Sequence, residues 1–499
     1  MSEELVIGVD CSTTSSKAIV FNKAGEIICS SSEPIKLFSP KENYYEQNAE
    51  DWWTSVITSL KKITTQINPE NIKALAIANQ RETFTILDES GNCIRPAIIW
   101  LDERCKDEVE PFSVKIGKKK IHSITGKPVD YAPVVYRLAW LKKHEKEQYK
   151  KISMVADVHT YITWKLTGKF KTSWSSADPL GMFDLKNKKW SQVILKELRL
   201  KNEQLPETFS PGTILGKISD EASQLTGLNR KTLVVAGGGD GQSAGLGANV
   251  LKSNIAYLNL GTAVVAGIYG SYYKTSNAFR TIGSCTSGGY YFETSLRAGT
   301  FAIDWFIKNI LKIDSVIYRN IYNKLDEEAQ NIPLGSGGLK YLPYICGVMN
   351  PYWDIDARGS FIGITSSHTR GHFYRSILEG IAFEQLFALE ETEKAAEIKV
   401  KRLAAMGGGT VNELWLRIIA DVTGREIIIP GCKEASALGA AINAAVASGF
   451  FKDHEAAAKS MTSIERVIMP DKKNHKTYQK YFTEYKKIYR SIKNLKVND

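Results

Sequence analysis

The sequence predicts a two-lobed α/β protein, and three observations lead to this class. The chain has 499 residues, of which 43% are hydrophobic and 24% charged, so it is long enough for two or three domains. Short apolar runs alternate with stretches of helical periodicity. The strand–turn–strand pattern of the N-terminal residues starts again at residue 255, which indicates two domains, residues 1–250 and residues 251–499.

Two hairpins mark the starts of the two halves. The first spans residues 5–21 and turns through a run of Ser and Thr, and the second spans residues 255–267 and turns at Gly261-Thr262. Such turns present backbone N–H groups and short hydroxyls that can bind phosphate oxygens. Two of them in one chain suggest two facing lobes that bind one nucleotide.

The remaining elements continue the alternation. In the first half, the pattern predicts a third strand that completes residues 5–35, strands at 72–77, 84–87, 94–100 and 233–236, and helical structure over 134–166. In the second half, it predicts strands at 402–405 and 426–429 and helices at 412–422, 435–448 and from 472 onward. Residues 435–448 are rich in Ala and Gly, which suits close packing against a neighbouring backbone. The last helix is Lys-rich and is expected on the surface.

Composition argues against several classes of partner. The net charge is +11, but the excess lies in separate stretches such as 118–120 and 472–496. These stretches are typical of solvated faces, and no base-stacking motif accompanies them, so nucleic acid is not expected as a partner. The charge could instead attract an anionic substrate. No run of 18 apolar residues predicts a membrane span.

The N-terminus and the cysteines indicate a cytoplasmic protein. Acidic Glu3 and Glu4 precede the first strand, which is unlike a signal peptide. The seven cysteines are scattered and no pair has the CxxC spacing, so we expect reduced core thiols rather than disulfides or a metal site.

Two aspartates stand where chemistry is expected. Asp10 ends an apolar strand before the hydroxyl-rich turn, where it could hold Mg²⁺ directly or through water while Thr13, Thr14 and Ser15 contact phosphate. An ordinary Asx turn is the alternative. Asp240 follows Gly237-Gly-Gly at a strand-to-helix turn, where a carboxylate could accept the proton of an attacking hydroxyl. A helix N-cap is the alternative there.

Two further groups suit ligand binding. Arg81 and Glu82 end a strand, and Asp102 follows Trp100 at the end of the neighbouring strand. Converging opposite charges of this kind can bracket a polyhydroxy ligand, although a surface ion pair has the same pattern. Residues 407–409 are glycines that open a helix together with Asn412, which suits a flat ligand such as adenine or a simple glycine turn.

Taken in order, these motifs resemble the FGGY family of carbohydrate kinases over nearly the whole chain. The matching segments are Gly8–Lys17, Asn79–Thr83, Gly237–Asp240, Gly261-Thr262 and Gly407–Asn412. Residues 359–379 also fit the second signature of the family. The resemblance implies two ribonuclease H-like domains, as in the actin, hexokinase and heat-shock chaperone ATPase superfamily, flanking a catalytic cleft. It also implies ATP-dependent transfer of the γ-phosphate to a hydroxyl of a small sugar or polyol.

The resemblance also implies roles for single residues. Asp240 falls on the catalytic base and Asp10 on the aspartate that holds Mg²⁺–ATP. Arg81, Glu82, Asp102, Asp240 and Gly241 fall in the substrate site. The nucleotide site takes Thr13, Thr14, Ser15, Lys17, Gly261, Thr262, Gly408 and Asn412. A homodimer is compatible with the resemblance, and no sequence feature specifies an interface.

The residues of the expected substrate site give conflicting indications about which sugar or polyol accepts the phosphate. Asn79–Thr83 resembles glycerol kinases, but Ala132, Gly241 and Val265 are each smaller than the residue those enzymes have, which predicts a roomier pocket. Trp100–Cys105 resembles xylulokinases, although Arg81-Glu82 replaces their Met-His pair. We therefore expect a ketopentose such as D-xylulose, with glycerol, another polyol or a sugar acid as alternatives. A nucleotide-binding regulator without sugar kinase activity is the alternative from another class.

Overall fold

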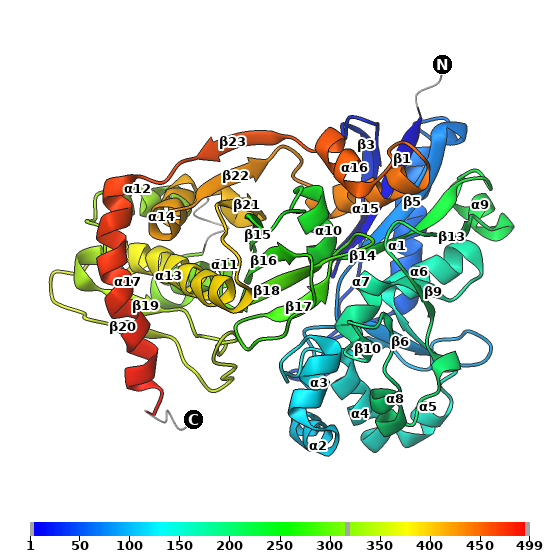
Figure 1. The fold of residues 1–499 in the computed structure, drawn as a ribbon, viewed down its shortest axis with the longest axis horizontal. Coiled ribbons are helices and arrows are strands. Elements are labelled where there is room, and N and C mark those ends of the chain that lie inside the picture. The colour runs from blue at the N-terminus through cyan, green and yellow to red at the C-terminus, as the bar shows by residue number, and fades with distance from the viewer. Residues whose placement is uncertain (1–3, 315–319, 495–499) are drawn as a thin grey trace.

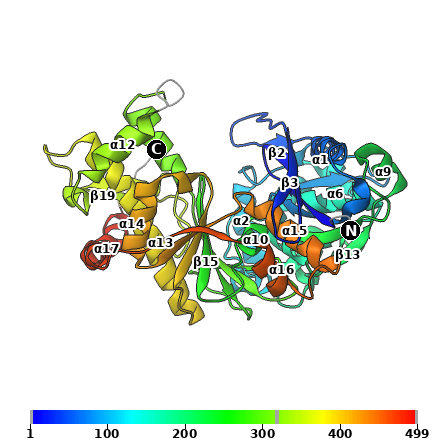
Figure 2. The ribbon, with the colours of Figure 1, turned by 90° about the horizontal axis from the view of Figure 1, so that it is seen from above.

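A computed structural model describes residues 4–314 and 320–494 of the chain. Two large β-sheets lie side by side in it, the first from residues 5–239 and the second from residues 255–468 (Figure 1). Seen from above, the molecule divides into two bodies that meet near α10 and α15 (Figure 2). The predicted two-lobed α/β class is therefore confirmed.

The first sheet contains the N-terminal hairpin. Its strands, in the order β13-β14-β5-β1-β2-β3, are Ile214–Lys217, Leu233–Gly239, Ile72–Asn79, Leu5–Cys11, Ser15–Phe21 and Ile27–Pro34. β1, β2 and β3 form the antiparallel meander predicted for residues 5–35, and β5 and β14 run parallel to β1. Helices α1 (Ala49–Thr64) and α6 (Val158–Thr167) share an apolar core with β1 and β5, in which Trp52 is fully buried.

The second sheet repeats this topology. Its strands, in the order β17-β18-β16-β15-β21-β22-β23, are Arg280–Gly283, Tyr290–Leu296, Val264–Gly270, Ile255–Leu260, Arg402–Met406, Glu426–Pro430 and Ile464–Ile468. β18, β16 and β15 are antiparallel like β3, β2 and β1, and β21 and β22 run parallel to β15 as β5 and β14 run parallel to β1. Both sheets therefore place the ends of parallel strands at one edge, where loops can form a site.

Helices α10 (Asp240–Gly247) and α15 (Ala435–Ala447) join the two bodies. α15 comes late in the chain but packs against β1 and β5 of the first sheet and against α10. The packing is backbone to backbone, since a Cβ on Gly439 would lie 1.9 Å from the carbonyl oxygen of Ser243 and one on Gly247 would lie 2.0 Å from that of Ala435. The close packing predicted for residues 435–448 is confirmed.

A smaller region extends from the first sheet. It contains the sheet β4-β7-β6-β8, with strands Glu46–Gln47, Ala97–Ile98, Phe84–Leu87 and Met154–Asp157. Its helices are α2 (Lys106–Ile116), α3 (Lys118–Thr125), α4 (Val134–His144), α5 (Lys146–Lys150) and α8 (Gln192–Leu198). The helical structure predicted over 134–166 is interrupted by β8, because that short buried apolar run pairs with β6 and its periodicity alone does not distinguish a strand from a helix.

The other elements complete the two bodies. In the first half they are β9 (Lys171–Ser173), β10 (Phe183–Asp184), β11 (Lys189–Trp190), β12 (Glu207–Phe209), α7 (Trp174–Ala177) and α9 (Asp220–Thr226). In the second they are α11 (Thr300–Trp305), α12 (Ile321–Gln330), α13 (Arg370–Ala396), α14 (Glu413–Thr423), α16 (His454–Met461), α17 (Lys472–Ile492), β19 (Lys340–Leu342) and β20 (Ser360–Ile362).

Two composition-based expectations concern the cysteines and the helices. All seven cysteines are free, and three of them, Cys11, Cys105 and Cys285, are buried as predicted. Cys346 is exposed, so it is not a core thiol. Within residues 4–314 and 320–494, none of the helices combines the length and the apolar character needed to cross a membrane.

The Lys-rich C-terminal helix is anchored by one aromatic face. Tyr478, Phe482, Tyr485 and Tyr489 of α17 are buried, although the rest of the helix is largely exposed. Tyr485 and Tyr344 donate hydrogen bonds, each of 2.8 Å, to Oε1 of Glu384 in α13. Burial raises the pKa of Glu384 to about 7, although both hydroxyls oppose the shift.

This raised pKa predicts how Glu384→Gln changes stability with pH. The folded protein holds a proton on Glu384 that the unfolded chain has already lost, so its stability falls as pH rises from the ordinary glutamate pKa of 4.5 to about 7. Gln carries no charge at any pH. We therefore expect Glu384→Gln to match wild-type Tm at pH 5 and to exceed it at pH 8 by roughly 2 °C or more, as measured by differential scanning fluorimetry.

A matched control lies on the same helix. Glu379 forms a 2.8 Å ion pair with Arg375, so Glu379→Gln should lower Tm at both pH values. A Glu384→Gln protein whose Tm falls equally at pH 5 and pH 8 would show that Glu384 is ionised in the folded state.

Candidate active site

The carboxyl ends of β1, β5 and β14 meet at one edge of the first sheet. These strands are parallel neighbours, with Cys11 beside Asn79 and Asn79 beside Gly239. Asp10 is the penultimate residue of β1 and Asp240 directly follows β14. The fold thus brings to one edge the two aspartates that the sequence separates widely.

Asp240 is an accessible carboxylate at the N-terminus of α10. Its Oδ1 accepts a 2.7 Å hydrogen bond from the N–H of Gly241, and Nε of Arg81 lies 3.4 Å from the same oxygen. Although the side chain is 41% exposed, the protein packed around it raises the pKa of Asp240; Arg81 lowers that pKa and Glu82 raises it. A carboxylate of this kind can accept a proton from a bound hydroxyl.

Arg81 joins the two lobes. Its Nη1 donates to both carboxylate oxygens of Glu293 in β18, at 3.1 and 2.9 Å. Glu293 also accepts from Nε of Arg280 and from the hydroxyl of Tyr257, each at 2.6 Å. Nη1 of Arg280 lies 3.3 Å from Oε1 of Glu82. Two guanidiniums and two carboxylates therefore connect the loop after β5 to the second sheet.

Charge balance keeps Glu293 ionised. Its side chain is fully buried, and burial alone would raise its pKa. Arg280, Arg81 and the Tyr257 hydroxyl outweigh that effect and lower the pKa to about 2. Within the same group, Glu82 has a left-handed backbone (φ 48°), a conformation that surrounding contacts must hold in place.

Asp102 is not brought to this group, contrary to the sequence-based expectation. Its carboxylate is fully buried and accepts hydrogen bonds from Nε and Nη2 of Arg104, at 2.8 and 2.7 Å. The N–H of Tyr45 donates to it as well, at 2.7 Å. Both oxygens are thus engaged inside the protein, which gives Asp102 a structural role in this arrangement.

The space expected at Gly241 is used by Arg81. A Cβ on Gly241 would lie 3.3 Å from Cζ of Arg81, and one on Gly239 would lie 2.7 Å from its Cγ. The two glycines therefore leave room for the arginine side chain.

The first hairpin turn is tightly closed. The N–H and hydroxyl of Ser12 both donate to the carbonyl of Ser15, at 2.9 and 2.8 Å. The hydroxyl of Thr13 accepts from Nε1 of Trp100 at 2.9 Å, while Thr14 is exposed. Lys17 forms a 2.8 Å ion pair with Glu434, next to α15. The turn is therefore preformed, with Thr14 facing outward.

Asp10 suits a bound cation. Its Oδ1 is buried and has no hydrogen-bond partner. Burial and, to a lesser extent, Asp240 raise the pKa of Asp10 to about 7, with Lys17 acting in the opposite direction. An unpartnered buried carboxylate is costly, and a hard cation would relieve that cost. Mg²⁺ commonly uses one or two carboxylates together with phosphate oxygens and water.

The second sheet presents a comparable edge. β15 and β21 are parallel, with Asn259 beside Met406. Gly261 and Thr262 follow β15, and Gly408 lies just after β21. Thr262 and Gly408 are exposed, and a Cβ on Gly408 would meet no atom within 4 Å. Of the four nucleotide-site residues predicted in this half, Thr262 and Gly408 therefore lie open at this edge, and Gly261 beside them is half-buried.

Asn412, the fourth, is engaged within the protein. It caps α14, since its Oδ1 accepts a 2.8 Å hydrogen bond from the N–H of Trp415. Its Nδ2 donates to Asp326 at 2.9 Å. In this arrangement Asn412 sets the start of the helix rather than offering a free amide.

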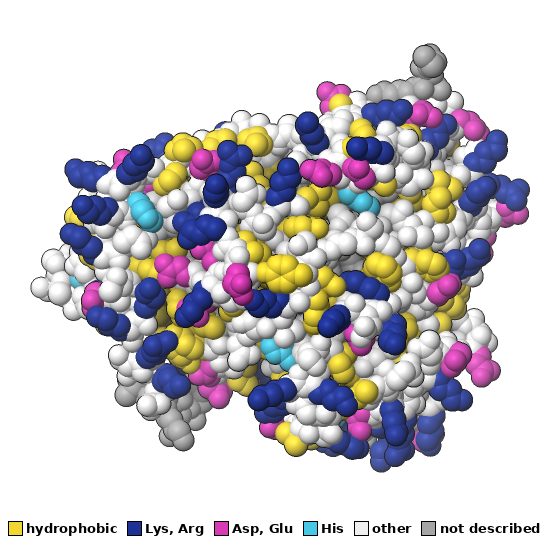
Figure 3. All heavy atoms as spheres, in the orientation of Figure 1, with side chains coloured by type: hydrophobic (Ala, Val, Ile, Leu, Met, Phe, Trp, Pro, Cys, Tyr) yellow, Lys and Arg dark blue, Asp and Glu magenta, His cyan; other side chains and the backbone are white. Residues whose placement is uncertain are grey.

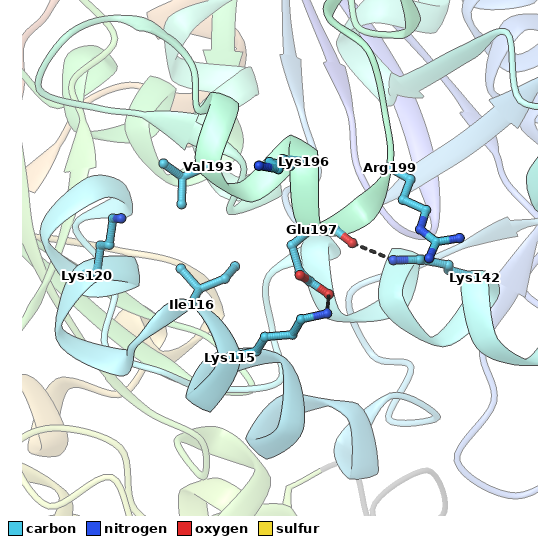
Figure 4. Close-up of a pocket in the computed structure, with 8 residues that line it drawn as sticks. All are labelled: Lys115, Ile116, Lys120, Lys142, Val193, Lys196, Glu197 and Arg199. Carbon is cyan, nitrogen blue, oxygen red and sulfur yellow. Dashed lines mark hydrogen bonds and ion pairs between the residues drawn. The ribbon is translucent and has the colours of Figure 1, made fainter.

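A separate hollow of about 320 Å³ lies in the smaller region of the first half (Figure 4). It contains none of the predicted site residues and is lined by Lys115, Ile116, Lys120, Lys142, Val193, Lys196, Glu197 and Arg199. Glu197 pairs with Lys115 at 2.8 Å. On the face shown in Figure 3, Lys and Arg side chains are spread among acidic ones, as expected for solvated surfaces.

Comparison with known proteins shows the family of this chain. A model of the FGGY family of carbohydrate kinases, N-terminal domain, matches residues 5–247, and that of the C-terminal domain matches residues 256–448. The chain belongs to the FGGY family of carbohydrate kinases. It is a sugar kinase, a phosphotransferase with an alcohol group as acceptor, as the sequence motifs predict.

Individual FGGY relatives match over nearly their whole length. A xylulose kinase of Bacillus subtilis (strain 168) is 29% identical, over 98% of this chain and 97% of the relative. The structure of a gluconate kinase from Lactobacillus acidophilus superposes with a TM-score of 0.92 at 25% identity, covering 98% of both chains. A ligand-bound xylulose kinase from the same species has a TM-score of 0.91 at 25% identity, covering 98% of this chain and 99% of that one.

Glu293, Arg280 and Tyr257 of this FGGY kinase were not predicted from the sequence. Glu293 could have been found because it is an acidic residue within the mostly apolar strand Tyr290–Leu296. An ionised group buried there needs partners. Nothing in the sequence indicated that one of its two arginine partners, Arg81, lies in the other half.

The packing of Arg81 predicts the effect of Gly241→Ala. The added Cβ would press on a guanidinium that Glu293 holds in place, so we expect Arg81 to shift by a few tenths of an ångström. Misplacement at a reacting site is costly, so kcat/KM for the sugar should fall about tenfold while KM for ATP stays within about twofold.

Gly288→Ala is the matched control. A Cβ on Gly288 would meet no atom within 4 Å, so its kinetics should equal those of wild type. Wild-type kinetics in Gly241→Ala would show that Gly241 does not confine Arg81.

Proposed function

We propose that this kinase transfers the γ-phosphoryl group of ATP to a hydroxyl of a ketopentose such as D-xylulose. The observation that carries the proposal is Asp240, an accessible carboxylate beside Arg81 and at the same sheet edge as the unpartnered Asp10. The full-length similarity to xylulose kinases supports the choice of acceptor.

Each group at the acceptor side has a role that its chemistry allows. Asp240 accepts the proton of the attacking hydroxyl. Arg81 donates to hydroxyl oxygens of the sugar, and Glu82 accepts from its hydroxyl groups. The N-terminus of α10 provides a favourable field for the negative charge of Asp240 and of the transferring phosphoryl group.

In this proposal, residues at the edges of both sheets bind the nucleotide. Asp10 would hold Mg²⁺, which neutralises charge on the phosphate oxygens during phosphoryl transfer. Thr13, Thr14, Ser15 and Lys17 of the first hairpin and Gly261 and Thr262 of the second would contact the phosphates. Gly408 would lie against the adenine ring because it presents bare backbone, and Asn412 would support that surface from its position at the start of α14.

A polyol such as glycerol is the second candidate acceptor. It is favoured by the Arg81-Glu82 pair, which resembles the pair of glycerol kinases and not the Met-His pair of xylulokinases. The two candidates differ in size and share the same roles for Asp240 and Asp10.

An acceptor screen tests the proposed function. ADP release is followed with ATP and Mg²⁺ and with D-xylulose, D-ribulose, L-ribulose, glycerol, erythritol or gluconate. We expect the highest kcat/KM with a ketopentose, because the site offers both donors and acceptors to several hydroxyls. Highest activity with glycerol would replace the ketopentose. Binding of ATP with no stimulation by any acceptor, across wider sugar panels as well, would overturn the proposal and favour a nucleotide-binding regulator.

Two substitutions separate the proposed roles of the aspartates. Asp240→Asn removes the proton acceptor, so kcat should fall by at least about 100-fold while the Kd for ATP stays within about threefold. Asp10→Asn should instead weaken Mg²⁺-dependent ATP binding, measured by isothermal titration calorimetry. Near-wild-type kcat in Asp240→Asn, or unchanged Mg²⁺ dependence in Asp10→Asn, would contradict the corresponding assignment.

A further inference from the structure

Glu293 is the point at which the second lobe contacts the acceptor side of the site. It lies in β18, and its carboxylate has no exposed surface. Three donors converge on its two oxygens: Arg81 from the first half and Arg280 and Tyr257 from the second. The substrate-binding arginine is therefore held by a residue from the opposite lobe.

The geometry of Arg81 shows what this contact does. Glu293 takes the Nη1 end of the guanidinium at 2.9 and 3.1 Å, whereas the nearest approach of Arg81 to Asp240, at Nε, is longer, 3.4 Å. Charge-assisted N–H···O bonds are typically about 2.7–2.9 Å, so the Arg81–Asp240 contact is loose. Asp240 already lies within ion-pair distance of Arg81, at 3.4 Å, so it is a carboxylate to which Arg81 could turn if the Glu293 charge were absent.

A tight Arg81–Asp240 pair would hinder the reaction. A bidentate guanidinium would occupy the carboxylate oxygens that have to accept the proton of the acceptor hydroxyl. Anchoring of Arg81 by Glu293 would therefore keep the guanidinium from pairing tightly with Asp240.

Arg280 connects Glu82 to Glu293 in a similar way. Its guanidinium contacts Glu293 at 2.5–2.6 Å and Oε1 of Glu82 at 3.3 Å. Both acceptor-side residues of the loop after β5 are therefore tied to the second sheet.

The charges of this group do not favour an anionic acceptor. Arg81 and Arg280 contribute two positive charges, and Glu82, Glu293 and Asp240 contribute three negative ones, which leaves a net charge of −1. In a partly desolvated site, each unpaired charge acts strongly on a bound ion. A neutral sugar avoids this repulsion, whereas a sugar acid such as gluconate meets it.

We propose that Glu293 is a positioning residue that holds Arg81 away from Asp240 and, together with Arg280, selects a neutral sugar over a sugar acid. This inference rests on the proposed function, since it takes Arg81, Glu82 and Asp240 to face the acceptor.

The kinetic test uses Glu293→Gln, which keeps the shape of the side chain and removes its charge. With D-xylulose, or the best neutral acceptor of the screen, kcat should fall about 30-fold while KM for ATP changes less than about twofold. The ratio of kcat/KM for gluconate to that for the neutral sugar should rise at least about tenfold, because one negative charge has left the site. Glu293→Asp, which restores the charge, should return that ratio toward the wild-type value.

Glu384→Gln is the matched control, because it also removes a buried carboxylate of the second half but touches none of these residues. It should leave the kinetics and the acceptor ratio unchanged. An equal loss with both acceptors in Glu293→Gln and Glu293→Asp would show a merely structural role and overturn the inference. A wild-type enzyme that prefers gluconate would overturn the selection of neutral sugars.

A crystal structure of Glu293→Gln gives a result that does not depend on turnover. We expect the Arg81 guanidinium to move onto Asp240, with two N···O distances of about 3 Å or less. An Arg81 that stays in its wild-type position would overturn the positioning role even if the acceptor screen supports the proposed function. A shift of Arg81 in a protein that phosphorylates no sugar would instead contradict the proposed function and leave the positioning role supported.

Discussion

The direct backbone contact between α10 and α15 is the constraint on which the rest of this structure depends. Gly247 and Gly439 allow the two helices to touch without intervening side chains. α15 also packs on β1 and β5, so one late segment of the chain is fixed to the first sheet. Because Asp240 is the first residue of α10, the same contact sets the position of the carboxylate relative to both sheets.

The duplicated sheet topology gives each lobe a comparable edge. In each sheet, parallel strands end at one edge, and the residues that follow them are free to bind ligands. The proposed site uses Asp10, Arg81 and Asp240 near the edge of the first sheet and the loops at Gly261 and Gly408 near the edge of the second. Phosphoryl transfer by a carbohydrate kinase depends mainly on positioning and charge neutralisation, which two such edges would together supply under the proposed function.

Electrostatics then distinguishes Glu293 from Asp10. Glu293 has two arginine partners, so it stays ionised at low pH and acts as an anchor. Asp10 has a buried oxygen without a partner, and its pKa is raised. The first is a completed interaction within the protein, whereas the second is an incomplete one that a cation would complete.

Local sequence alone determined much of this. Alternating apolar residues and turn chemistry predicted the meander at residues 5–35 and the second hairpin at residue 255, because strand pairing across a short turn is a local property. The Ala- and Gly-rich composition of 435–448 predicted close packing, because small side chains allow backbones to approach each other. The glycine turn before Asp240 likewise marked the start of a helix, and the order of the motifs pointed to the family.

Only the tertiary structure decided which charged groups meet. Asp102 had the same sequence signal as Arg81, yet it is fully engaged by Arg104 and the Tyr45 backbone. Arg81 is paired with Glu293, a residue of the other half that no local pattern connects to it. Burial and charge pairing depend on which residues are close in space. Residues far apart in the chain become close only when the two sheets are brought together.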